Sequence, residues 1–236
     1  MRVALFVTCV NDAVYPATGI ATVRLLERLG VEVDFPAAQT CCGQPQFNTG
    51  YRRETEPLVR RTARAFEGYE YVVTPSGSCA AMVREHYPRF GERSLPSRTH
   101  ELTEFLVDVL GVTDVGAYFP HTVTYHPSCH GLRILRLGDR PRRLLDAVKG
   151  LELRELPGAE ECCGFGGTFA VKNADVSAAM GWDKVRHARS TGASVLCGAD
   201  NSCLMHIDGI LRRQDEPLRA LHIADILAST EEEPLL

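Results

Sequence analysis

Several features that would place a protein in a class at once are missing from this chain of 236 residues. No apolar run approaches eighteen residues, which argues against a transmembrane helix. Acidic residues outnumber basic ones, and the net charge of -4 gives no electrostatic basis for binding nucleic acid or an anionic membrane. Aromatic residues make up 7% of the chain, and the rest of the composition is typical of a soluble globular protein.

Common cofactor and catalytic signatures are also missing. The glycine-rich stretch at residues 164–167 is not followed by Gly-Lys-Ser/Thr, so it does not predict a phosphate-binding loop, nor is it a dinucleotide fingerprint. No single histidine stands out as the partner of a nucleophilic cysteine. The apolar start at residues 1–7 is too short for a secretion signal and is soon interrupted by Asn11 and Asp12. We therefore expect a cytoplasmic protein.

The chain does have nine cysteines, and eight of them form two similar sets. Each set contains an adjacent pair followed by glycine, with one cysteine well upstream and one well downstream. The spacing between equivalent cysteines of the two sets is nearly constant, which indicates an internal duplication. The two sets are Cys9, Cys41, Cys42 and Cys79, and Cys129, Cys162, Cys163 and Cys203.

Strand-like and helix-like segments alternate along both halves of the chain. We expect strands at residues 3–8, 31–35, 69–74, 122–125 and 193–197. We expect helices at residues 19–29, 52–66, 80–87, 101–110, 142–148, 174–189 and from 201 onward, with a linker at 111–120 and a terminal element at 221–227.

This alternation predicts an α/β fold in which parallel sheets are built from βαβ units. The duplication predicts two halves, residues 1–116 and 117–236, related by a pseudo-twofold axis. Each cysteine then lies beyond the carboxyl end of a strand, the edge at which open α/β sheets bind ligands.

Four cysteines that meet at one sheet edge suit a metal site. In a reducing cytoplasm, recurrent spaced cysteines favour metal or redox chemistry over structural disulfides. Adjacent cysteines favour an iron–sulfur cluster over a zinc ion, because neighbouring thiolates can reach different irons and structural zinc sites usually use separated pairs. Glycines that permit close backbone approach follow both pairs, at Gly43, Gly164, Gly166 and Gly167. The expected cofactor is one iron–sulfur cluster per half, which aerobic preparation can remove.

Other interpretations stay open from the residues alone. A redox dithiol at each adjacent pair would leave Cys9 and Cys129 unexplained, and a zinc or structural thiol module would contain no sulfide. Cys197 falls inside a strand, at the position that Val73 occupies in the first half, and is interpreted as a small core residue, while the sequence leaves open whether it substitutes as a ligand for Cys203. His126 and His130 flank Cys129 and could reach a bound cluster; they are interpreted first as polar residues near the site, and the sequence leaves open whether either is a ligand.

The motifs around these cysteines resemble those of the duplicated cysteine-rich (CCG) domain found in heterodisulfide reductases and in the iron–sulfur subunits of glycolate oxidase. The most similar family is lactate utilization protein A. The resemblance covers essentially the whole chain. It is carried by the strings at residues 7–9, 39–45, 75–79, 126–130, 162–169 and 203–205.

The resemblance implies an iron–sulfur electron-transfer subunit of a multi-subunit system that oxidises L-lactate to pyruvate. Its implied partners are a ferredoxin-like iron–sulfur subunit and a third lactate-utilization subunit. A catalytic iron–sulfur subunit of the heterodisulfide reductase type is the alternative.

The full CCG pattern ends in Cys-x-x-Cys and supplies five cysteines. Here Ser76 and Asp200 occupy the first position of that pair, so each half offers four, which favours a simpler cluster. The sequence leaves open whether either side chain contributes an oxygen ligand.

Overall fold

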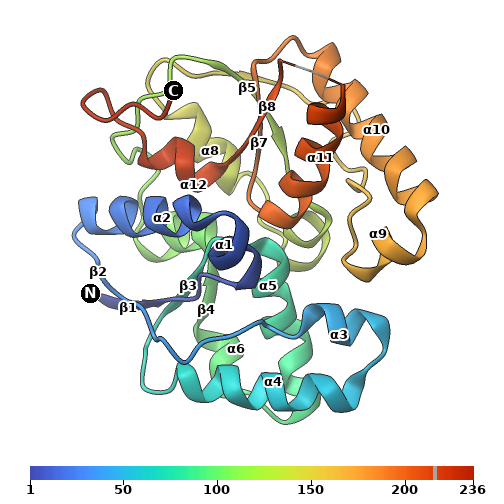
Figure 1. The fold of residues 1–236 in the computed structure, drawn as a ribbon. Coiled ribbons are helices and arrows are strands. Elements are labelled where there is room, and N and C mark those ends of the chain that lie inside the picture. The colour runs from blue at the N-terminus through green and yellow to red at the C-terminus, as the bar shows by residue number, and fades with distance from the viewer. Residues whose placement is uncertain (215–216) are drawn as a thin grey trace.

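The computed structural model describes residues 1–214 and 217–236 and contains two four-stranded sheets, one in each half of the chain. All strand pairs are parallel. The first sheet has the order β2-β1-β3-β4, with β1 at Arg2–Leu5, β2 at Glu32–Asp34, β3 at Val72–Thr74 and β4 at Thr99–Glu101. The second has the order β6-β5-β7-β8, with β5 at Thr122–His126, β6 at Glu152–Arg154, β7 at Val195–Gly198 and β8 at Arg219–His222. Figure 1 shows one half above the other.

The register of the strands repeats between the sheets. Val3 pairs with Val33 in the first sheet, and Val123 pairs with Leu153 at the same point of the second. Strands β3 and β7 are buried along their whole length. Their apolar runs suit the inner position of a parallel sheet, where helices cover both faces. The predicted α/β fold with two duplicated halves is confirmed.

Helices follow the strands in the same order in both halves. Those of the first half are α1 (Cys9–Val14), α2 (Pro16–Arg28), α3 (Gln44–Thr49), α4 (Arg52–Ala65), α5 (Gly77–Ala81), η1 (Met82–His86), η2 (Tyr87–Phe90), α6 (Ser94–Arg98), α7 (Leu102–Glu104) and η3 (Phe105–Val109). Those of the second half are η4 (His130–Leu135), α8 (Arg140–Asp146), α9 (Thr168–Lys172), α10 (Ala174–Ser190), α11 (Asn201–Arg213) and α12 (Ile223–Ala228).

The contacts between the halves repeat the pseudo-twofold relation. Helix α2 packs against α12, and the equivalent elements α8 and α7 pack against each other. Likewise α5 packs against η4, and its equivalent α11 packs against α1. Equivalent elements of the two halves therefore make equivalent contacts across the interface. This arrangement brings the carboxyl ends of both sheets toward each other.

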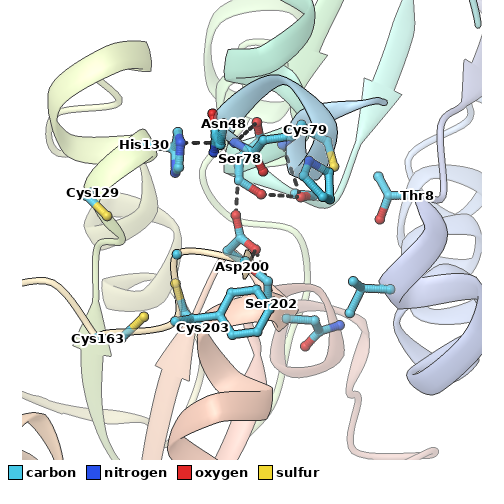
Figure 2. Close-up of a pocket in the computed structure, with 18 of the residues that line it drawn as sticks. Thr8, Asn48, Ser78, Cys79, Cys129, His130, Cys163, Asp200, Ser202 and Cys203 are labelled. Atoms are coloured by element: carbon cyan, nitrogen blue, oxygen red, sulfur yellow. Dashed lines mark hydrogen bonds between the residues drawn. The ribbon is translucent and has the colours of Figure 1, made fainter. Parts of the chain in front are cut away.

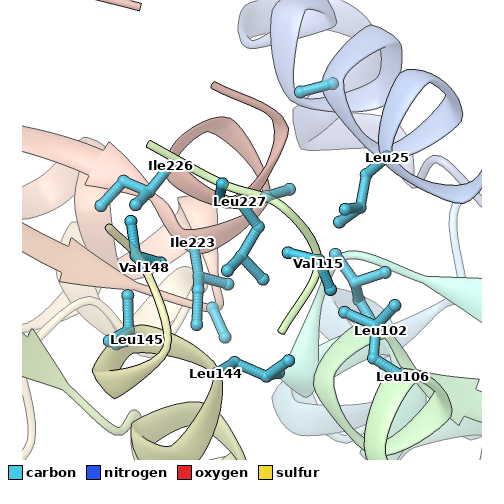
Figure 3. Close-up of a cluster of buried hydrophobic side chains, with 14 of the residues drawn as sticks. Leu25, Leu102, Leu106, Val115, Leu144, Leu145, Val148, Ile223, Ile226 and Leu227 are labelled. Atoms are coloured by element: carbon cyan, nitrogen blue, oxygen red, sulfur yellow. The ribbon is translucent and has the colours of Figure 1, made fainter. Parts of the chain in front are cut away.

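One hydrophobic core spans the interface. Figure 3 shows Leu25, Leu102 and Leu106 of the first half facing Leu144 and Ile223 of the second. The segment at 111–120, expected to be a linker, contributes three buried side chains to this core: Val115, Ala117 and Phe119. Burial of each large apolar side chain contributes roughly 1.5–3 kcal/mol, so the halves are held together without any metal. The boundary at residues 116 and 117 lies in this segment and stays a prediction.

Several short elements were not expected, among them the helices α1, α3, α6 and η4 and the elements β4, β8 and α9. Strand β4 forms directly before and at the start of the helix predicted at residues 101–110. Neither β8 nor α9 was predicted as an element of its own. Strand β4 is three residues long and is defined only by pairing with β3, so it leaves no periodic pattern in the sequence. In the part of the chain that the structure describes, none of the helices has the length and apolar character needed to span a membrane.

Candidate metal centres between the two halves

The chain reaches the first cysteine of each set through an unusual backbone conformation. Thr8 has φ of 74° and Ser128 has φ of 51°, and each directly precedes a cysteine, Cys9 or Cys129. Residues other than glycine rarely adopt positive φ, and such strain concentrates at functional sites. A residue with positive φ therefore stands directly before the first cysteine in both halves.

A left-handed glycine follows each adjacent cysteine pair. Gly43 has φ of 83° and Gly164 has φ of 91°. The Gly43 N–H donates to Cys41 Sγ over 3.4 Å, and the Gly164 N–H donates to Cys162 Sγ over 3.3 Å. A Cβ atom at residue 164 would lie 2.4 Å from the carbonyl oxygen of Ser177. Glycine is therefore required at residue 164 both for the left-handed turn and for the close packing of this turn against α10.

The last cysteine of each set is the third residue of a helix. Cys79 lies in α5, where the Ser76 hydroxyl caps the helix by accepting a hydrogen bond from the Cys79 N–H. Cys203 lies in α11, which the Asp200 carboxylate caps by accepting from the Ser202 N–H over 3.2 Å. Ser76 and Asp200 thus serve as equivalent N-caps that fix the direction in which each helix begins.

The eight predicted cysteines form two separate groups of four free thiols. In the first half, Cys42 Sγ lies 3.3 Å from Cys79 Sγ, and Cys41 is hydrogen-bonded to Cys42 and Cys9. The second half repeats this arrangement. There Cys129 Sγ lies 3.8 Å from Cys162 Sγ, and Cys163 is hydrogen-bonded to Cys162 and Cys203.

Each group holds one thiol whose pKa is strongly lowered. Hydrogen bonds from Cys42 and Cys9 lower the pKa of Cys41 to about 3, and those from Cys129 and Cys163 lower the pKa of Cys162 to about 2. The donating thiols change in the opposite direction: the pKa of Cys42 is raised, first by its hydrogen bond to Cys41. Negative charge on one thiolate thus opposes ionisation of its neighbours, and a bound cation is what would let all four ionise together.

Both groups face one cavity at the interface of the halves. The cavity has a volume of about 150 Å³ and is lined by Cys9 and Cys79 from the first half and by Cys129, Cys162, Cys163 and Cys203 from the second. In Figure 2, Cys129, Cys163 and Cys203 lie on one side of the close-up and Cys79 on the other. The tertiary structure therefore gives the two cysteine sets a common space.

Polar side chains connect the two halves beside this cavity. Asp200 is buried, and its Oδ2 accepts a hydrogen bond from the Ser78 N–H of the other half over 2.7 Å (Figure 2). The Asn201 amide donates to Asn11 Oδ1 over 2.9 Å. Asp200 therefore receives hydrogen bonds from both cysteine-bearing helices, a role that its position in the sequence does not reveal.

The sequence placed His126 near the site, but the structure gives it a different position from the one expected. It is the last residue of β5 rather than a loop residue, and it is 1% exposed. A ring nitrogen, Cys163 Sγ and Cys203 Sγ all lie within 4.8 Å of one another. Burial lowers the pKa of His126 to about 4. The sequence marks this residue only by its position near Cys129, and the duplication adds no signal, because Phe6 stands at the equivalent point of the first half, three residues before its cysteine.

The remaining candidates lie outside the two groups. His130 Nε2 lies 3.0 Å from Gln44 Nε2 of the other half, on the wall of the cavity. Cys197 is fully buried in the shared core, at the strand position equivalent to Val73, so its interpretation as a core residue is confirmed. The thiol groups, their amide contacts and the buried imidazole together fit the binding of a metal ion or cluster.

Comparison with known proteins agrees with the duplication. A family model described as a cysteine-rich domain (CCG) matches twice, at residues 3–84 and 123–208. A crystal structure of a hypothetical protein from Helicobacter pylori superposes with a TM-score of 0.62 at 10% sequence identity, and covers 96% of this chain and 48% of that chain. At that identity the likeness concerns the fold alone.

Curated proteins match over nearly their full length. Lactate utilization protein A of Geobacillus kaustophilus is 52% identical over 236 residues, covering 96% of this chain and 98% of that protein. The proteins of the same name from Bacillus subtilis and Oceanobacillus iheyensis are 49% identical over 237 residues and 48% identical over 241 residues. They cover 97% and 98% of this chain, and 100% and 98% of their own lengths. The chain is therefore a member of the lactate utilization protein A family, built from two cysteine-rich CCG domains.

Proposed function

We propose that this protein holds two iron–sulfur clusters, one in each half, and transfers electrons within a multi-subunit system that oxidises L-lactate to pyruvate. The observation that carries the cofactor is the grouping of eight thiols into two equivalent sets of four, with six of the eight lining one cavity. The lactate-oxidising system is inferred from relatives named lactate utilization protein A, at about 50% identity over the whole chain.

The first cluster would be held by Cys9, Cys41, Cys42 and Cys79, and the second by Cys129, Cys162, Cys163 and Cys203. A bound cluster would supply one-electron chemistry that side chains lack. The contribution of the chain is to place the thiols and to aim the Gly43 and Gly164 amides at sulfur, where hydrogen bonds tune reduction potentials.

Electron transfer of this kind needs donors and acceptors outside the chain. The proposed partners are a ferredoxin-like iron–sulfur subunit and a third lactate-utilization subunit, in the cytoplasm. Cys9 is exposed, so the first thiol set reaches the surface from which an electron can enter or leave.

A second candidate is a catalytic subunit of the heterodisulfide reductase type. The cavity favours it, because a space of about 150 Å³ between the two thiol sets is large enough for part of a small substrate. If this candidate is right, the isolated chain with clusters will reduce a small disulfide by itself. An electron-transfer subunit will do so only when its partners are added.

The cofactor is tested by anaerobic purification followed by assays of iron and acid-labile sulfide. We expect about equal amounts of iron and sulfide in the wild type, and about half of both in Cys42→Ser and in Cys163→Ser. Cys197→Ser is the matched control and retains the full amount, because Cys197 lies in the shared core. Zinc in place of iron, or no metal after anaerobic reconstitution, would overturn the proposal.

A further inference from the structure

The imidazole of His126 is buried without a hydrogen-bond partner. The ring lies at the end of β5, and within residues 1–214 and 217–236 neither Nδ1 nor Nε2 is paired with another polar atom. A buried ring nitrogen that lacks a partner costs free energy, about 1–3 kcal/mol, unless something outside the chain satisfies it. The ring nitrogens of His126 are therefore available to bind a ligand from outside the chain.

The atoms nearest to the ring show what kind of ligand fits. One ring nitrogen and the sulfurs of Cys163 and Cys203 lie within 4.8 Å of one another. Bonds of about 2.0–2.3 Å to one metal ion would place two tetrahedral donors about 3.5–3.8 Å apart, so a small contraction suffices for all three to bind one ion. The hydrogen bond between Cys163 and Cys203 explains why the two sulfurs are close, but no hydrogen bond explains why the ring of His126 lies beside them.

The first half lacks this donor. Phe6 lies three residues before Cys9, as His126 lies three residues before Cys129, and Phe6 is fully buried in an apolar cluster. The first half offers only thiols, whereas the second half offers thiols and one imidazole. The two sites are thus different in chemistry although their backbones are equivalent.

We propose that His126 is a metal ligand of the second half, binding iron through a ring nitrogen beside Cys163 and Cys203. This inference rests on the proposed iron–sulfur function and adds that the two centres are not equivalent. The second centre has mixed nitrogen and sulfur ligation, and the first is bound by sulfur alone.

The first experiment is pulsed electron paramagnetic resonance of the reduced, anaerobically purified protein with the Cys42→Ser substitution, which leaves the second centre to be observed. We expect a strongly coupled ¹⁴N nucleus that disappears in His126→Phe, a variant that copies the first half. His130→Gln is the matched control, because His130 contacts Gln44 on the cavity wall, and it keeps the coupling. A coupling that persists in His126→Phe would overturn the inference.

A second experiment separates the inference from the proposed function. Apoprotein with the Cys42→Ser substitution is titrated with Co²⁺ alone, and the d–d absorption bands reveal its ligands. We expect His126→Phe to weaken Co²⁺ binding at least about tenfold, as is typical when a residue that supports a metal site is lost, and to shift the bands. His126→Leu tests the same point if the phenylalanine does not fit, with circular dichroism as the check on folding.

The outcomes of the two experiments are distinct. If the wild type contains no iron or sulfide, the proposed function fails, while the Co²⁺ titration still tests His126. If iron and sulfide are present but neither the ¹⁴N coupling nor Co²⁺ binding depends on His126, the inference alone fails.

Discussion

The two halves of the molecule share a backbone but differ in the side chains that surround their thiols. The strand register, the positive φ at Thr8 and Ser128, and the left-handed glycines are the same in both. Next to the cysteines, however, the first half has Phe6 where the second has His126. This comparison shows that the positions of the sulfurs depend on backbone geometry, whereas the chemistry around them has diverged.

A second difference lies at the end of the fourth strand in each half. Glu101 and His222 occupy equivalent positions and both are buried. Each caps the following helix: Glu101 Oε2 accepts from the Thr103 N–H over 2.7 Å, and His222 Nδ1 accepts from the Ala224 N–H over 3.1 Å. The same capping task is therefore performed by an acid in one half and a base in the other.

The largest effect is expected from alanine at the glycines that follow the cysteine pairs. Positive φ costs an alanine about 1–2 kcal/mol, and an overlap of the kind found with Ser177 adds about 1–3 kcal/mol. We therefore expect Gly164→Ala to lower the free energy of unfolding by about 4 kcal/mol. Urea denaturation of the apoprotein measures this loss.

Gly43→Ala is the matched variant in the first half. The nearest atom to its new Cβ would be Thr55 Cγ2 at 3.3 Å, which a small shift can relieve. Only the cost of positive φ then remains, about 1–2 kcal/mol. Equal losses in the two variants would show that the glycine turns are not packed differently in the two halves.

The next largest effect is a dependence of the free energy of unfolding on pH, which has opposite signs in the two halves. Burial raises the pKa of Glu101 from 4.5 to about 7, so its proton is held more tightly in the folded protein and stability falls as pH rises across that interval. Burial lowers the pKa of His222 from 6.5 to about 4, so the unfolded chain binds the proton more readily and stability falls as pH drops across that interval. Each of these pKa shifts changes the free energy of unfolding by about 3 kcal/mol.

Two variants separate these contributions, with the free energy of unfolding measured from about pH 4 to about pH 8. We expect Glu101→Gln to remove part of the loss above pH 4.5, and His222→Asn to remove part of the loss below pH 6.5. Asp225 and His126 titrate in overlapping intervals, so each variant is compared with the wild type rather than with a flat profile. A variant profile parallel to that of the wild type would contradict the assignment.

The smallest expected effect concerns the caps of the two cysteine-bearing helices. Asp200→Ala removes the α11 cap and the hydrogen bond from the Ser78 N–H of the other half, and we expect a loss of about 2 kcal/mol. Ser76→Ala removes two long hydrogen bonds at the start of α5, the one from the Cys79 N–H over 3.4 Å and the one with the Ser78 hydroxyl over 3.4 Å, and we expect about 0.5–1 kcal/mol. Thermal unfolding of the apoproteins ranks the two variants, and a larger loss for Ser76→Ala would contradict the bridging role of Asp200.

Much of the architecture could be predicted from local patterns. Helix α4 at Arg52–Ala65 and helix α10 at Ala174–Ser190 agree closely with the expected ranges, because each is long and amphipathic enough for periodicity to reveal it. The place of Cys197 in a strand was predicted from its alignment with Val73. Strand β4 could not be predicted, because its three residues become a strand only by pairing with β3.

The sequence by itself determined the duplication, the alternation of strands and helices, and the eight cysteines of the candidate site, because these are repeated or periodic features that neighbouring residues encode. Only the tertiary structure placed both thiol sets on one cavity, turned the ring of His126 toward Cys163 and Cys203, and joined Asp200 to Ser78. Those contacts join residues far apart in the chain. They arise when the shared hydrophobic core packs the two halves together, which no local pattern specifies.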